Sequence, residues 1–193
     1  MQVFNGTEQL PRFSNPVVAV GAFDGVHLGH VRILRFLCEQ AKKVNGTSVV
    51  MTFSPHPRTV LRPDTSFFTI NKLEDNLKLI EKQGVDVVLI QPFTLEFSRK
   101  SYQQFIEEVI LGTLHAHTLV MGPNHAIGHH REGDHDSIKH YCREHALQVV
   151  DIPEEMWHSA GVHSAVIREH IRKKDWETVD AMLGYHYELE VRS

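Results

Sequence analysis

A strand, a glycine-rich turn and a helix follow one another near the start of this chain, and this unit constrains the fold most. The run Val17–Val20 is apolar and largely β-branched, which is typical of a buried strand. From Val31 to Leu37, apolar residues recur at helical spacing. A buried strand that passes through a short turn into a helix is typical of a parallel α/β sheet.

The turn itself carries two histidines three residues apart, His27 and His30, with Gly29 between them. Residues at this spacing share one face of a helix, so both imidazoles are predicted to point the same way from its first turn. The unpaired N–H groups and the dipole at the start of a helix favour an anion there. A protonated imidazole is therefore disfavoured at this place, unless a bound phosphate makes the local charge negative. Glycine in a first turn costs on the order of 1 kcal/mol relative to alanine, and it fits a place where a ligand approaches the backbone closely. We therefore predict a phosphate site of a nucleotide; the alternative is an ordinary turn with exposed histidines.

The rest of the chain alternates strands with helices, which predicts an α/β fold with a doubly wound parallel sheet of five strands and short C-terminal helices. The expected strands are Val17–Val20, Thr47–Phe53, Asp86–Ile90, Thr118–Met121 and Leu147–Ile152. The expected helices are Gly29–Lys43, Asn71–Gln83, Ser101–Ile110, Ser137–His145, Ser164–Lys173 and Asp175–Leu183. Ligands of such sheets bind beyond the carboxyl ends of the strands. Three loops begin there and are expected to converge on one crevice: Gly21–His30, Phe53–Arg58 and Gly122–Arg131.

Composition limits the class of protein. With 193 residues, 41% apolar and 23% charged, the chain has the size and composition of one globular domain. Its formal net charge of −4 gives no electrostatic argument for nucleic acid. The first residues lack a basic start and a long apolar core, so we expect neither a signal peptide nor a membrane span. Cys38 and Cys142 are expected to be reduced thiols, although the sequence leaves a disulfide open, and the expected location is the cytoplasm.

Two motifs together resemble a known family. Gly-Ala-Phe-Asp-Gly-Val-His-Leu-Gly-His at residues 21–30, followed by Thr-Phe-Ser-Pro-His-Pro at residues 52–57, resembles the FMN adenylyltransferase module of bacterial bifunctional riboflavin kinase/FAD synthetases. These enzymes belong to the nucleotidyltransferase superfamily marked by His-x-Gly-His. The resemblance implies a Rossmann-like nucleotidyltransferase domain over residues 1–185. Residues 186–193 would be a tail where a riboflavin kinase domain begins in the family, so we expect the adenylyltransferase half alone.

The resemblance also implies a reaction. AMP is transferred from ATP to FMN, giving FAD and pyrophosphate, by in-line attack of the FMN phosphate on the α-phosphorus of ATP. Such a reaction needs positioning and charge stabilisation more than a nucleophilic side chain. Mg²⁺ is expected to arrive with ATP and to be held by phosphate and water, not by a set of protein ligands. ATP and FMN are the expected partners, with neither nucleic acid nor membrane among them; the oligomeric state is left open.

The residues that match the family's motifs divide by role. The catalytic group is His27, His30, Ser164 and Arg168, in which the histidines donate to phosphates, Ser164 caps a late helix and Arg168 pairs with the β- and γ-phosphates. The binding group is Gly21, Phe23, Asp24 and Gly29 on the nucleotide side, with Pro55, Pro57 and Asn124 on the flavin side. For the two prolines, a rigid turn after a strand is an equally sound interpretation from the residues alone.

The chain departs from the family pattern at two places. The late-helix motif Ser-Ser-Thr-x-x-Arg has His163 and Ala165 in place of a serine and the threonine, which should weaken triphosphate binding by about 1 kcal/mol per lost hydrogen bond. The loop Gly122–Gly128 has lost two aromatic residues, and Asn124 replaces a carboxylate. Two alternatives therefore stand beside FMN adenylylation: transfer to a different phosphorylated acceptor, and a non-catalytic domain that binds nucleotide or flavin.

A cluster of histidines lies in and after this loop, at His125, His129, His130 and His135. Its spacing fits no common zinc pattern, and histidines in a glycine-containing loop are usually solvated. Metal binding is the alternative, and so is a phosphate contact by His125 or His129.

Overall fold

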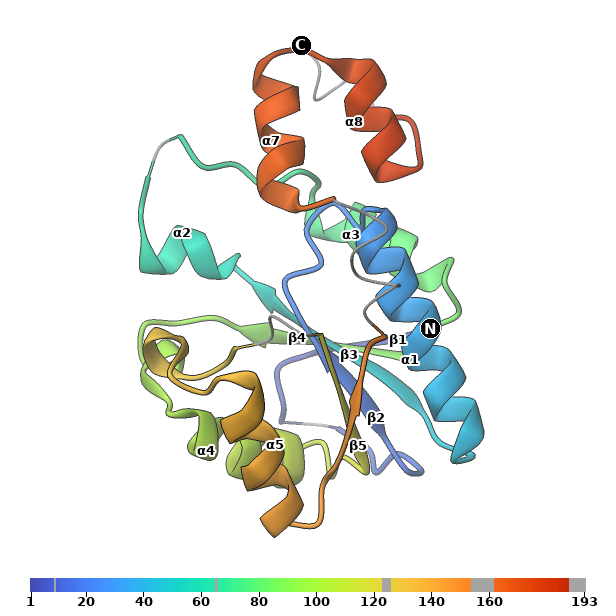
Figure 1. The fold of residues 1–193 in the computed structure, drawn as a ribbon, viewed down its shortest axis with the longest axis vertical. Coiled ribbons are helices and arrows are strands. Elements are labelled where there is room, and N and C mark those ends of the chain that lie inside the picture. The colour runs from blue at the N-terminus through green and yellow to red at the C-terminus, as the bar shows by residue number, and fades with distance from the viewer. Residues whose placement is uncertain (9, 65, 123–125, 154–161, 188–193) are drawn as a thin grey trace.

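The computed structural model of the chain describes residues 1–8, 10–64, 66–122, 126–153 and 162–187. Within them lies one parallel sheet with helices packed on both of its faces (Figure 1). The strands among the described residues are β1 (Gln2–Asn5), β2 (Val17–Val20), β3 (Ser48–Ser54), β4 (Val87–Pro92), β5 (Thr118–Met121) and β6 (Gln148–Asp151), in the order β1-β4-β3-β2-β5-β6. The chain runs outward from β2 in both directions, so the strand order reverses beside β2, where ligands of such sheets bind.

The helical segments are α1 (Leu28–Lys43), α2 (Pro57–Leu61), α3 (Leu73–Glu81), η1 (Phe97–Arg99), α4 (Tyr102–Gln104), η2 (Phe105–Leu111), η3 (His129–Arg131), α5 (His135–Glu144), α7 (Ser164–Arg172) and α8 (Trp176–Leu183). Alternate residues of each strand face opposite sides of the sheet. On one side Val17 and Ala19 of β2 pack with α1 and α3, and on the other Val18 packs with η2 and α5. The two apolar layers fix the strand in the sheet centre, and its carboxyl end leads into the glycine-rich turn.

Local signals in the sequence place several helix ends correctly. The predicted capping box at Ser101 is present, since its Oγ accepts from the Gln104 N–H at 3.1 Å and the Gln104 side chain accepts from the Ser101 N–H at 3.0 Å. Gly184 ends α8 in the left-handed conformation, with φ 76°. Strand β5 covers the predicted residues Thr118–Met121.

The sheet has one strand more than predicted. The prediction of five strands was wrong because β1, at one edge of the sheet, has only four residues, and three of them are exposed. A short edge strand need not carry the apolar run that marks a buried strand. The five-residue helix α2 was not predicted either: Pro57 ends the strand signal but also opens a helix, where its missing N–H is no loss.

Helices α7 and α8 form a small layer of their own beyond the carboxyl ends of the strands, at the top of Figure 1. Their apolar side chains enclose a third core with Ile70, Ile167, Val179, Leu183 and Tyr187. This packing brings the start of α7 next to the turn before α1.

The remaining expectations concern membranes and thiols. No helix in the described ranges is long and apolar enough to cross a bilayer. Cys38 and Cys142 are free, buried thiols on α1 and α5. These helices lie on opposite faces of the sheet, so the fold excludes a disulfide between them.

Candidate active site

The turn between β2 and α1 has an unusual backbone. Phe23, Gly25 and Val26 have φ values of 45°, 80° and 35°, in the left-handed region that only glycine enters without strain. A Cβ on Gly25 would also lie 2.9 Å from the side chain of Ile70. A turn of this shape persists only where surrounding contacts hold it.

Asp24 is the centre of those contacts. Its side chain is 3% exposed, and Oδ1 accepts a hydrogen bond from the backbone N–H of Ile70 at 2.9 Å. The same carboxylate forms an ion pair with Arg168, which is 5% exposed and donates through Nε to the Phe68 carbonyl at 2.8 Å. The structure therefore brings together two predicted site residues from distant parts of the sequence, and they bind each other.

Other bonds tie the turn to the C-terminal helices. The Ser164 hydroxyl donates to the Asp24 carbonyl at 3.1 Å, and the Tyr185 hydroxyl donates to the Gly25 carbonyl at 2.6 Å. The Gly25 N–H donates to Asn76 Oδ1 at 3.1 Å. The prediction that Ser164 caps the late helix was wrong: the cap residue of α7 is His163, and Ser164, one residue later, turns its hydroxyl toward the loop.

The two predicted histidines lie together where α1 begins. His27 is the cap residue before the helix, not part of its first turn, and its Nδ1 accepts from the His30 N–H at 3.3 Å. The two rings are stacked, with centroids 3.7 Å apart and planes at 18°. A Cβ on Gly29 would approach the His27 ring to 3.1 Å, so glycine leaves the space into which His27 folds. The Nδ1 atom of His30 is buried without a hydrogen-bond partner in the described part of the chain.

Both imidazoles are neutral near pH 7. Burial lowers the pKa of His27 to about 4, with smaller contributions from the nearby charges of His163 and Arg168. Burial, and then the charges of His27 and His163, hold the pKa of His30 well below its usual range. Neutral imidazoles avoid repulsion from the positive end of α1, and a bound anion would favour their protonated forms.

A cavity of about 680 Å³ opens beside the same turn. Its volume lies within the range of small-molecule sites. The lining residues come from the ends of β2 and β3, from α2 and the residue after it, from the segment after β4 through η1 to the start of η2, and from the segment before α5. They are Val20, Gly21, Ala22, Phe53, Pro57, Leu61, Arg62, Phe93, Phe97, Ser98, Lys100, Phe105, Ala126, Ile127, Gly128, His129, His130 and Arg131. Four phenylalanines pack edge to face or tilted against one another, with centroids 5.4 Å apart for Phe53 and Phe93. The wall is apolar and aromatic, and the other lining side chains include cations.

The predicted flavin-side residues have different positions relative to this cavity. Pro57 lines it, together with Gly21 from the nucleotide side, whereas Pro55 is not among the lining residues. Asn124 lies outside the described residues. Sequence reasoning missed the aromatic wall. Phe93 directly follows β4 and Phe97 lies in the same segment, at the start of η1, so the rule that ligands bind at the carboxyl ends of strands pointed to this loop as well.

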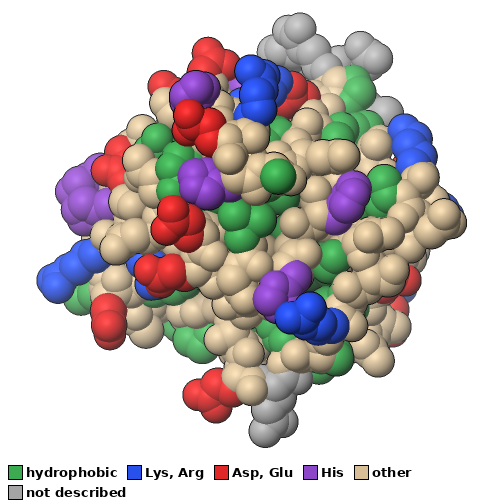
Figure 2. All heavy atoms as spheres, turned by 90° about the horizontal axis from the view of Figure 1, so that it is seen from below, with side chains coloured by type: hydrophobic (Ala, Val, Ile, Leu, Met, Phe, Trp, Pro, Cys, Tyr) green, Lys and Arg blue, Asp and Glu red, His purple; other side chains and the backbone are tan. Residues whose placement is uncertain are grey.

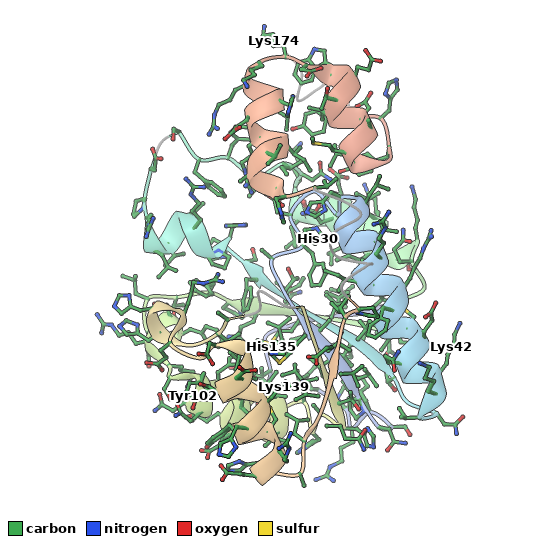
Figure 3. The ribbon with its side chains drawn as sticks, in the orientation of Figure 1. His30, Lys42, Tyr102, His135, Lys139 and Lys174 are labelled. Atoms are coloured by element: carbon green, nitrogen blue, oxygen red, sulfur yellow. The ribbon has the colours of Figure 1, made fainter. Side chains whose placement is uncertain are left out.

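The histidine cluster is divided in space. His129 and His130 line the cavity, whereas His135 lies on α5, where its Nε2 is 2.8 Å from Asp151 Oδ1 (Figure 3). His125 lies outside the described residues. Within the described ranges, no three histidine, cysteine or acidic side chains are grouped so as to hold a metal ion. Figure 2 shows described histidine, acidic and basic side chains interspersed on the face viewed from below, without a continuous basic patch.

Comparison with known proteins identifies the family. A family model described as FAD synthetase matches residues 10–166, most of the chain. The chain belongs to the FAD synthetase family. The resemblance carried by the motifs at residues 21–30 and 52–57 is thereby confirmed.

Individual relatives agree with this family assignment. A bifunctional riboflavin kinase/FMN adenylyltransferase of Listeria monocytogenes is 33% identical over 180 residues, covering 90% of this chain and 55% of the relative. Proteins of the same description from Haemophilus influenzae and Escherichia coli K12 are 27% and 26% identical, over 98% and 91% of this chain. The chain spans 55–62% of the length of these three relatives.

A solved structure supports the fold. The structure described as a macrolide-efflux protein from Streptococcus pneumoniae superposes with a TM-score of 0.83 and 23% identity, over 97% of this chain and 72% of that one. The predicted α/β fold with a parallel sheet is confirmed, with the extra strand β1.

Proposed function

We propose that this FAD synthetase family chain transfers AMP from ATP to FMN, producing FAD and pyrophosphate. One observation carries the proposal: the stacked pair His27–His30, with its unpartnered buried nitrogen, lies at the start of α1 beside an aromatic cavity that shares the turn residues Gly21 and Ala22. A site for polyphosphate and a site for a flat, aromatic acceptor therefore meet at one turn. The names of the relatives, which include FMN adenylyltransferase, support the same reaction.

The geometry suits transfer between two phosphates. The FMN phosphate is already ionised, so its oxygen attacks the α-phosphorus without a general base; the new P–O bond forms as the bond to pyrophosphate breaks. The neutral rings of His27 and His30 donate N–H groups to phosphate oxygens, and the N–H groups at the start of α1 add to them. Catalysis then depends on positioning and charge stabilisation.

Arg168 and Ser164 act in this proposal mainly through the turn. Both bind Asp24, so they set the position of the backbone from which the histidines project. Arg168 also places a positive charge beside the phosphates. Asp24 is correspondingly a positioning residue, since its carboxylate is occupied by Arg168 and by backbone N–H groups.

Mg²⁺ is proposed to accompany ATP. The described residues offer no group of three ligands for it, which suits an ion held mainly by phosphate oxygens and water. When bound, it neutralises charge that develops on the leaving pyrophosphate.

For the acceptor, the cavity favours FMN. Aromatic faces such as Phe53 and Phe97 can pack against an isoalloxazine ring. The lining cations Arg62, Lys100 and Arg131 can attract a phosphate group. A different phosphorylated acceptor is the second candidate, since the family pattern is altered in the loop at residues 122–128.

We also propose that the protein works in the cytoplasm. Two buried free thiols, Cys38 and Cys142, suit a reducing compartment, and ATP is available there.

One assay tests the proposed function. Purified chain is incubated with ATP, Mg²⁺ and FMN, and FAD and pyrophosphate are measured by chromatography and a coupled assay. We expect both products in equal amounts. Pyrophosphate release only with another phosphorylated acceptor would support the second candidate, and binding without turnover would indicate a non-catalytic domain.

A further inference from the structure

We propose that Tyr185 is a positioning residue of the phosphate site: its hydroxyl completes a ring of hydrogen bonds that holds the Gly25 backbone and, through it, His27. In this role Tyr185 acts through the turn and touches no substrate. The inference rests on the proposed function, because it names a residue that keeps the histidine pair of that site in place.

Both polar groups of the Gly25 backbone are bound by side chains. Its N–H donates to Asn76 Oδ1 at 3.1 Å, and its carbonyl accepts from the Tyr185 hydroxyl at 2.6 Å. Asn71 connects these two partners, since its Nδ2 donates to Asn76 Oδ1 at 3.3 Å and to the Tyr185 oxygen at 2.7 Å. Side chains from the start of α3 and from the segment after α8 thereby close one ring around the turn.

Gly25 needs such support because of its backbone conformation. It is buried, with φ 80°, and its neighbours Phe23 and Val26 also have positive φ values. A backbone of this kind persists only where the surrounding contacts determine it. A fully satisfied hydrogen-bond network is rigid, whereas the loss of one partner leaves a buried polar group unpaired. Without the Tyr185 hydroxyl, the Gly25 carbonyl loses this donor.

The position of the Gly25 backbone determines where His27 lies. Val26 alone separates the two residues, and its side chain is fixed in the core at 1% exposure. A shift at Gly25 therefore moves His27, which accepts from the His30 N–H and stacks on the His30 ring. A displacement of about 1 Å in a positioned group can lower a rate by about 10²-fold.

Tyr185 is itself held in place where the chain leaves α8. Gly184 ends that helix, and a Cβ on it would lie 2.5 Å from the Leu28 side chain at the start of α1. The Tyr185 ring packs against the third core, beside Ile70 and Val179. Burial raises the pKa of the Tyr185 hydroxyl, so it keeps its proton at neutral pH and can donate.

The variant Tyr185→Phe tests the role, because it removes the hydroxyl and keeps the ring. We expect kcat for FAD formation to fall about tenfold, with KM for FMN within about twofold, since neither Tyr185 nor Gly25 lines the acceptor cavity. In the free protein, NMR titration should show the pKa of His27 rising above its value of about 4, because a displaced imidazole is less buried.

Tyr187→Phe is the matched control. Tyr187 lies in the same core, and its hydroxyl donates to the Ile70 carbonyl at 2.8 Å. This variant loses a buried hydrogen bond of the same kind, so its urea midpoint should fall about as much as that of Tyr185→Phe. Both polar groups of Gly25 keep their partners, so kcat and the pKa of His27 should stay as in wild type.

A double-mutant cycle with Asn71→Ala tests whether the ring acts as a unit. The two substitutions together should lower kcat less than the product of their separate effects. Wild-type kcat and an unchanged His27 pKa in Tyr185→Phe would overturn this inference alone. Equal losses of kcat in Tyr185→Phe and Tyr187→Phe would reduce Tyr185 to a structural role and contradict it as well. A wild-type chain that forms no FAD would overturn the proposed function, and the His27 titration would still test the ring.

Discussion

The two ends of the site are held together in different ways. At the end proposed to bind the nucleotide, buried polar contacts join residues far apart in the chain, including Asp24 with Arg168 and Gly25 with Tyr185. At the end proposed to bind the acceptor, phenylalanines from three segments pack against one another around a cavity. Polar contacts with defined geometry allow few substitutions, whereas apolar walls tolerate changes that preserve volume. Under the proposed function, the polar contacts of the turn should therefore tolerate fewer substitutions than the aromatic wall of the cavity.

The largest expected effect comes from the nucleotide end. His30→Ala removes a ring that the proposal places on a phosphate, and we expect kcat for FAD formation to fall by about 10²–10³-fold, as for other lost donors to developing charge. FMN affinity should stay within about twofold, because the acceptor cavity does not include His30. Steady-state kinetics and FMN fluorescence titration check both.

His129→Ala is the matched control from the other end. His129 lines the cavity, so its loss should act on FMN affinity more than on kcat. An unchanged kcat in His30→Ala would contradict the assignment of the histidine pair.

Breaking the ion pair between Asp24 and Arg168 should have the next largest effect, which is a loss of stability. Asp24→Asn leaves the buried Arg168 guanidinium without its counter-charge, and we expect the free energy of unfolding to fall by about 3 kcal/mol. Urea unfolding measures this loss. The double variant Asp24→Asn, Arg168→Met removes both charges and should recover part of the lost stability. An Asp24→Asn variant as stable as wild type would contradict the role given to this ion pair in holding the turn.

Acidification should weaken the nucleotide end through its buried histidines. The pKa of His27 is about 4 in the folded chain and near 6.5 in an unfolded one, so the unfolded chain binds more protons between these values. The stability that depends on a neutral His27 is therefore fully present above the unfolded pKa of about 6.5, and it is lost as the pH falls toward the folded pKa of about 4. Between about pH 6.5 and 5, His27 alone should remove about 2 kcal/mol.

Urea unfolding at several pH values across this range measures how steeply the free energy of unfolding changes with pH. His27→Gln should reduce this dependence, whereas His140→Ala, which replaces an exposed histidine of α5, should not. A pH dependence that His27→Gln leaves unchanged would mean that this imidazole is not buried neutral in the folded chain.

The smallest effect is expected at the acceptor end. Phe97→Ala removes one aromatic wall of the cavity, and we expect about a tenfold weaker affinity for FMN, with ATP affinity unchanged. Phe97→Leu keeps the apolar volume and should lose less. If Phe97→Ala weakened ATP and FMN equally, the division of the site into two ends would be wrong.

Sequence patterns predicted those elements of the fold whose residues alone, without their partners in space, indicate a strand, a helix or a helix cap. The apolar run of β2, the helical spacing of α1 and the capping box at Ser101 are local, and each was confirmed. The edge strand β1 was missed because pairing with β4, not an apolar pattern, makes it a strand.

The residues of the proposed site could be singled out from the sequence, but the contacts among them could not. His27, His30 and Asp24 stood out in one motif, yet the pairing of Asp24 with Arg168 joins residues 144 positions apart. The aromatic cavity depends on strand order, which places the ends of β3 and β4 side by side. No single segment contains that information.

The most direct test of the account is a crystal structure of the chain with the α,β-methylene ATP analogue, Mg²⁺ and FMN. The account predicts the triphosphate at the start of α1, within hydrogen-bond distance of His27 and His30, and the isoalloxazine ring in the phenylalanine-lined cavity. The FMN phosphate oxygen should then lie about 3–3.5 Å from the α-phosphorus, in line with the bridging group that leads to the β-phosphate. A triphosphate bound away from the histidine pair, or a flavin outside the cavity, would contradict it.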